Sequence, residues 1–266
     1  MSQKIRIKNF IHALLSKTLQ FKNDMGLLNK RKSLPFLNLC EYFADRPHLL
    51  DYKEWASLLT TFAYVLNKRV KNTDGINPTF LIECKLKACK AAIDMCVISS
   101  HQMDSYYCKQ LMWTASTLIL EWFPHLEDNS VNESDKDLFK CYVRQLARSI
   151  VIPSTKENVL HIICSWTTML LAAEDHFTTI PNPKTLEIMI VIGKADVNFP
   201  DKENDMPLDK LRLNFEKRVN DGVVTVGENE KRNAINCARI LNHHNGQSST
   251  PVQEIIENIR NVENVE

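Results

Sequence analysis

Apolar side chains recur every three or four positions through the first 150 residues, which is the spacing of one buried face of an α-helix. The first such stripe consists of Ile7, Phe10, Ile11, Leu14, Leu15 and Leu19. Later stripes are separated by polar or proline-containing breaks, and residues 106–122 are apolar around most of the helix circumference. We therefore predict an all-α chain that opens with irregular stacked helical hairpins over residues 1–150, without a fixed repeat period.

Residues 151–217 carry motifs of a different kind, which are typical of ankyrin repeats. A histidine is expected to hold the turn before the first helix, and a glycine to end the second helix in a left-handed conformation. Asp and Asn are expected to bridge the next turn, and Asn204 to adopt left-handed geometry where glycine is usual. The ankyrin-type positions are Leu160, His161, Gly193, Ala195, Asp196, Asn198, Pro207 and Leu208. This pattern predicts divergent ankyrin-type repeats.

Four stretches, in the same order along the chain, resemble the C-terminal part of the Fem-1 family. They are residues 5–14, which contain His12-Ala13-Leu14, then residues 144–150 followed by 157–163, and residues 234–241 and 250–259. A long insertion at residues 165–180, inside the ankyrin-type segment, also matches the family in kind. Fem-1 proteins are ankyrin-containing substrate receptors of cullin-2 RING ubiquitin ligases. The resemblance therefore implies a non-catalytic ligase adaptor that ends in a two-helix box over residues 228–262.

In that family the first helix of the box binds elongin C and the second binds the cullin. The resemblance assigns the elongin contact to Ala234, Cys237, Ile240 and Leu241. It assigns the cullin contact to Pro251, Ile255, Ile256 and Ile259. Elongin B–C and cullin-2 are therefore the expected partners.

One alternative follows from departures from the family pattern. Asn233 stands where the elongin-binding helix should carry leucine, and burying an asparagine amide without a partner costs about 1–3 kcal/mol. One ankyrin repeat and the long N-terminal ankyrin array of the family are missing. The alternative is a helical and ankyrin scaffold that binds proteins without ligase coupling, and the chain is expected to be a divergent short paralogue or a fragment of a longer product.

Composition and charge narrow the classes of partner. The chain has 33 Lys and Arg against 32 Asp and Glu, so no field strong enough for general nucleic-acid binding is expected. No apolar stretch is long enough to span a bilayer, and the N-terminus lacks the apolar core of a signal peptide. The eight cysteines stand singly within helical patterns, as in a reducing compartment. A cytoplasmic, possibly nuclear, protein without membrane contact is expected.

The histidine and cysteine residues do not form a recognisable catalytic or metal-binding motif. His161 and Cys164 lie one helical turn apart and could form a thiol–base pair, but His161 is already assigned to the ankyrin-type turn and no orienting group is evident. Cys84, Cys89 and Cys96 lack the Cys-x-x-Cys spacing of a zinc site, so core packing is expected for them. No catalytic residue, metal, cofactor or small-molecule substrate is therefore predicted.

Overall fold

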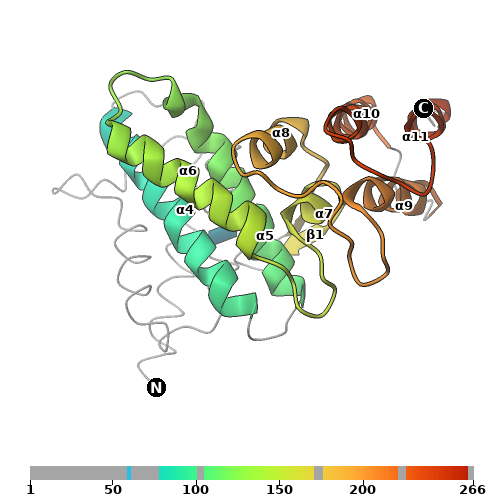
Figure 1. Ribbon diagram of the computed structural model, residues 1–266, viewed down its shortest axis with the longest axis horizontal. Coiled ribbons are helices and arrows are strands. Elements are labelled where there is room, and N and C mark those ends of the chain that lie inside the picture. Colours follow the sequence, from blue (N-terminus) through green and yellow to red (C-terminus); the bar gives the residue numbers. More distant parts are fainter. Residues whose placement is uncertain (1–58, 61–77, 101–104, 171–175, 221–225, 263–266) are drawn as a thin grey trace. The chain divides into compact units, whose positions relative to one another are not determined.

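The computed structural model of the 266-residue chain describes residues 59–60, 78–100, 105–170, 176–220 and 226–262 (Figure 1). The helices that the sequence predicts before residue 59 lie outside the described residues. So does the Fem-1-like stretch at residues 5–14. The account below is confined to the described part of the chain.

The chain divides into two compact units, which are described separately. The first contains α4 (Pro78–Ser100), α5 (Ser105–Trp122), the 3₁₀-helix η2 (Phe123–Leu126) and the part of α6 (Glu133–Ser149) up to Phe139. The second contains the rest of α6, then α7 (Val159–Ile163), α8 (Pro183–Val191), α9 (Pro207–Asn220), α10 (Glu228–His243) and α11 (Val252–Asn261). The predicted all-α class is confirmed as a mostly helical fold. The exception is a two-stranded sheet of β1 (Thr168–Leu170) and β2 (His176–Thr178), which forms inside the predicted insertion.

Helix α5 is the core helix of the first unit, as its apolar circumference predicts. Its buried residues are Cys108, Gln110, Leu111, Met112, Thr114, Ala115, Ser116, Thr117, Leu118, Ile119 and Trp122. Trp122 closes the helix: its indole N–H donates to the carbonyl of Ile82 on α4 at 3.2 Å, and its ring stacks on Phe139 of α6 at a centroid distance of 4.4 Å. A buried indole needs both an apolar surround and a hydrogen-bond acceptor, and Trp122 has both.

Helix α6 begins earlier than its apolar stripe predicts. The sequence suggests a polar loop up to residue 137, but the helix starts at Glu133. Asn132 explains the difference, because its side-chain oxygen accepts the N–H of Asp135 at 2.7 Å and satisfies a free donor of the first turn. Glu133 and Asp135 also place negative charge near the positive end of the helix dipole. The first turn is stabilised by capping and not by burial, so hydrophobic periodicity does not reveal it.

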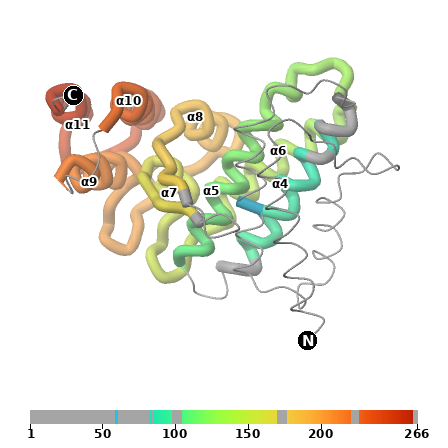
Figure 2. The backbone as a smooth tube through the Cα atoms, turned by 180° about the vertical axis from the view of Figure 1, so that it is seen from behind, coloured from blue at the N-terminus to red at the C-terminus, as the bar shows by residue number. Residues whose placement is uncertain are grey.

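Helix α10 is the central helix of the second unit and contacts α8, α9 and α11 (Figure 2). Its inner face consists of Ala234, Cys237, Ala238 and Leu241, all fully buried. Their spacing of three and four positions places them on one side of the helix. The facing side of α11 consists of the buried Ile255, Ile256 and Ile259. Burying each of these isoleucines contributes about 1.5–3 kcal/mol, which explains why the short terminal helix folds back onto α10.

The end of α8 corrects one expectation from the sequence. The left-handed residue there is Lys194, with φ 57°, and not Gly193. Glycine is needed at position 193 for space: a Cβ there would lie 2.4 Å from the carbonyl oxygen of Met189 and 2.6 Å from Cβ of Ala147 on α6. Gly193 therefore allows α8 and α6 to approach closely. Asn204 does adopt the expected left-handed conformation, with φ 66°.

Replacement of Gly193 by alanine tests this close approach. We expect Gly193→Ala to lower the free energy of unfolding by about 2 kcal/mol, because backbone and α6 must move to admit the methyl group. Gly227→Ala is the matched control, since a Cβ at position 227 meets no atom within 4 Å. Urea denaturation of both variants measures the difference, and a loss of the same size in both would contradict the packing argument.

Candidate functional site

The start of α7 is held by a reciprocal pair of hydrogen bonds. The side-chain oxygen of Asn158 accepts the backbone N–H groups of Leu160 and His161, at 3.0 and 3.3 Å. In return, Nδ1 of His161 accepts the N–H of Asn158 at 3.2 Å. The neutral imidazole with its proton on Nε2 can also donate to the carbonyl oxygen of Asp205, 3.1 Å away. His161 therefore joins the start of α7 to the loop before α9.

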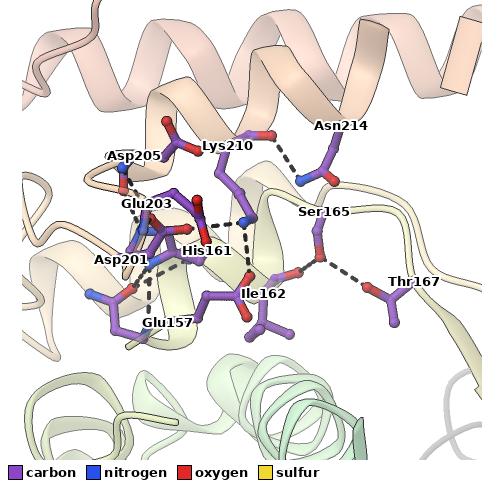
Figure 3. Close-up of polar contacts among 11 residues, drawn as sticks. Glu157, His161, Ile162, Ser165, Thr167, Asp201, Glu203, Asp205, Lys210 and Asn214 are labelled. Atoms are coloured by element: carbon purple, nitrogen blue, oxygen red, sulfur yellow. Dashed lines mark hydrogen bonds and ion pairs between the residues drawn. The ribbon is translucent and has the colours of Figure 1, made fainter. Parts of the chain in front are cut away.

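An ionic cluster lies beside this histidine (Figure 3). Lys210 of α9 extends its ammonium group between two buried carboxylates: Glu157 at 3.2 Å and Asp201 at 3.0 Å. The other oxygen of Asp201 accepts the backbone N–H groups of Glu203 and Asp205, at 2.8 and 3.0 Å. These contacts connect α9, the 201–205 loop and the segment before α7. Sequence analysis missed the cluster, because its charged members are far apart along the chain.

The cluster keeps its charges despite burial. Burial alone would lower the pKa of Lys210, but the hydrogen bond to Asp201 and the charge of Glu157 outweigh it and raise that pKa above its usual value. Burial likewise opposes the charged form of Asp201. The hydrogen bonds from Lys210 and from the N–H of Asp205 outweigh this effect, so the pKa of Asp201 is lowered. Lys210 and Asp201 both remain charged at neutral pH.

Asp209 accepts a backbone N–H at the start of α9, as His161 does at the start of α7. One of its oxygens accepts the N–H of Met206, three residues earlier, at 3.2 Å. Its other oxygen accepts the hydroxyl of Ser248 and both the hydroxyl and N–H of Ser249, at 2.7–2.8 Å. Burial raises the pKa of Asp209, but these bonds outweigh it and lower the pKa overall. Asp209 thereby fixes the segment that leads from α10 into α11.

The remaining positions of the predicted ankyrin-type motif also lie in turns and in the core. The side chain of Asp196 accepts the N–H of Asn198 at 2.9 Å, which closes the turn after α8. Asn198 then bonds across to the end of α10: its amide donates to the carbonyl of Asn245 at 3.1 Å and its oxygen accepts the N–H of Gln247 at 2.7 Å. Leu160, Ala195, Pro207 and Leu208 are buried. The roles of these residues are structural.

Cys164 and His161, which the sequence suggests as a thiol–base pair, are both fully buried. Burial raises the pKa of Cys164 to about 12, so the thiol is protonated at neutral pH. Both ring nitrogens of His161 are engaged by Asn158 and Asp205, as described above. Cys89 and Cys96 are buried on α4, and burial raises the pKa of each. In the described part of the chain, no group of three or more His, Cys, Asp or Glu side chains could hold a metal ion.

The structure places most of the suggested elongin and cullin residues inside the chain. Ala234, Cys237 and Leu241 form the buried face of α10, and Ile255, Ile256 and Ile259 form the buried face of α11. The other two residues are accessible: Ile240 is half-buried and Pro251 is exposed at the start of α11. Asn233 is half-buried. A partner could reach most of these six buried residues only if the packing of α10 and α11 against their neighbours were disturbed.

The outer side of these two helices is hollowed. We call this surface the α10–α11 groove; it consists of two adjoining hollows of about 480 and 430 Å³, both lined by Arg239 and Arg260. Arg232 lines the second hollow, and all three arginines are exposed. Within the described residues none of the three forms an ion pair with a carboxylate; Arg239 donates to the side-chain oxygen of Asn236 at 3.4 Å. Sequence analysis missed the groove, although the seven-residue spacing of Arg232 and Arg239 places them on one helix face.

Comparisons with protein-family models, curated protein sequences and solved structures find no match to this chain. None of the described helices combines the length and the apolar character required to cross a membrane.

Removal of Lys210 tests the ionic cluster. We expect Lys210→Met to lower the free energy of unfolding by about 3 kcal/mol, because it leaves two buried carboxylates without their shared cation. Lys217→Met, at an exposed position of the same helix, should change it by no more than about 0.5 kcal/mol. Urea denaturation at pH 7 measures both, and similar effects at the two positions would contradict a stabilising role for the cluster.

The pH dependence of stability tests the buried histidine. Burial lowers the pKa of His161 below 6.5, the usual value for an unfolded chain. Below about pH 6.5 the unfolded state therefore binds a proton at this histidine more readily than the folded state does. The free energy of unfolding is highest above about pH 6.5 and falls as the pH is lowered further. We expect His161→Gln to reduce this slope in the pH interval below about 6.5. His125, whose pKa burial also lowers, accounts for part of the remaining slope.

Denaturant midpoints across that pH interval provide the measurement. An unaltered slope in His161→Gln would show that this side chain does not titrate on unfolding.

Proposed function

We propose that the chain is a non-catalytic protein-interaction adaptor whose docking element is the α10–α11 pair. One observation carries the proposal: each helix buries one apolar face inside the chain, and together they form an outer groove with three arginines not neutralised by described carboxylates. Grooves between packed helices are common sites for peptide and protein recognition. The protonated Cys164 and the fully engaged His161 support the non-catalytic part of the proposal.

Two helix pairs in the second unit share local features, which supports the proposal of ankyrin-type repeats. Helices α7 and α9 both begin with a side chain that binds the backbone N–H three residues before it: His161 on Asn158 and Asp209 on Met206. Helices α8 and α10 are both followed by a residue in left-handed geometry, Lys194 with φ 57° and Asn245 with φ 62°. We interpret α7–α8 and α9–α10 as two divergent copies of one helical hairpin.

A cullin-RING ligase is the specific assembly that we propose for the adaptor, with elongin B–C and cullin-2 as partners. The motif resemblance at residues 234–241 and 250–259 supports this assignment, and Ile240 and Pro251 are the two suggested contacts that a partner can reach. The burial of Cys237 and Leu241 favours the alternative, a helical scaffold that binds proteins without ligase coupling. The proposed compartment is the cytoplasm, with the nucleus as the alternative, because the five buried cysteines among the described residues are free thiols.

Co-elution with elongin B–C in size-exclusion chromatography distinguishes a ligase adaptor from a scaffold without ligase coupling. Removing α10 is unsuitable as a test, because this helix supports α8, α9 and α11. We expect the intact chain to co-elute with elongin B–C, and Ile240→Arg to weaken the complex at least about tenfold by placing a charge in the contact. Leu213→Arg is the matched control, since Leu213 is an exposed apolar residue on α9.

Failure of the intact, folded chain to co-elute would reject the ligase assignment and leave the scaffold function. Co-elution that persists undiminished in Ile240→Arg would reject the assigned contact surface.

A further inference from the structure

The α10–α11 groove gathers positive charge from two helices. Arg232 and Arg239 come from α10, and Arg260 comes from α11 on the other side. All three side chains are exposed, and no described carboxylate forms an ion pair with any of them. By contrast, Arg212 of α9 is paired with Glu216 at 3.0 Å. The groove arginines are thus free to bind an anionic ligand.

The chemistry of these side chains favours carboxylates attached to an aliphatic chain. A guanidinium group presents a planar fork of donors that matches the two oxygens of a carboxylate. The charge-assisted hydrogen bonds between them are stronger than hydrogen bonds between neutral groups. The same hollows are also lined by apolar residues: Ile235, Val252 and Ile256. Hollows of about 480 and 430 Å³ fit within the size range of specific ligand pockets and can hold a few amino-acid side chains.

A nucleic acid fits this surface less well. No Phe, Tyr or Trp side chain lines either hollow, so His243 is the one ring there on which a base could stack. Glu228 lines one of the hollows, and Glu254 and Glu257 are exposed on α11. These negative charges interrupt the continuous positive track that a phosphate backbone requires.

We propose that the α10–α11 groove binds an acidic segment of a partner protein, with carboxylates on Arg239 and Arg260 and aliphatic side chains on the half-buried Ile235 and Val252. The inference rests on the proposed protein-interaction function and specifies the ligand chemistry of its docking element. It does not depend on elongin B–C, because Ile240 does not line the groove.

Fluorescence anisotropy with a labelled peptide of alternating Glu and Leu tests the proposal on the full chain. We expect binding that Arg239→Glu and Arg260→Glu each weaken about tenfold, since each variant replaces a charge-assisted pair by repulsion. Arg239→Lys should retain more of the affinity than Arg239→Glu, because it keeps the charge. Arg148→Glu is the matched control: Arg148 is exposed on α6, outside the groove, and its substitution changes net charge equally.

Three further probes make the result decisive. The same peptide with Gln in place of Glu should bind at least about tenfold more weakly, and about 0.5 M NaCl should reduce binding of the Glu peptide. Failure of the Glu peptide to bind, or equal weakening by Arg148→Glu, would overturn the proposal. So would tighter binding of a single-stranded oligonucleotide, which would assign the groove to nucleic acid. If the groove variants still form an elongin complex while the peptide fails, the adaptor function stands and only this inference is lost.

Discussion

The arrangement of the second unit depends on Lys210 and the two buried carboxylates beside it. Glu157 precedes α7, Asp201 lies in the loop after α8, and Lys210 is on α9, so one ammonium group connects three separate segments. Removing these charges from water is costly, and the cluster is favourable only because each charge meets an opposite charge or a backbone N–H. His161 and Asp209 extend this polar layer along the helix starts. Together they position α9, against which α10 packs.

The terminal helices carry buried apolar residues and exposed charged residues on opposite faces. The inner faces, with Cys237, Leu241 and three isoleucines, are committed to the core. The outer faces carry three exposed arginines. A partner that uses the outer side need not disturb the packing of α10 against α11. A partner that needs the buried residues would first have to separate the two helices, and each isoleucine exposed would cost about 1.5–3 kcal/mol.

Apolar periodicity was sufficient to predict α4 and α5, because each of these helices has a continuous buried face. Helix α8 was predicted from the ankyrin-type motif, and α10 and α11 from the resemblance to the Fem-1 family. Periodicity did not reveal the first turn of α6, which Asn132 caps, or the short β1–β2 pair. At the end of α8 the sequence correctly indicated a structural glycine, but its predicted left-handed conformation was wrong. Gly193 leaves space for Ala147 of α6, and the left-handed residue is Lys194. The ionic cluster and the α10–α11 groove could not be predicted, because both join residues from separate elements.

The central claim is that this chain functions by binding proteins through the outer side of α10 and α11. Quantitative affinity purification from cells tests it most directly, with wild type, Arg239→Glu and Arg148→Glu compared at equal expression. The account predicts at least one protein that is retained by wild type and by Arg148→Glu but lost by Arg239→Glu. Identical sets of retained proteins for all three chains would contradict it.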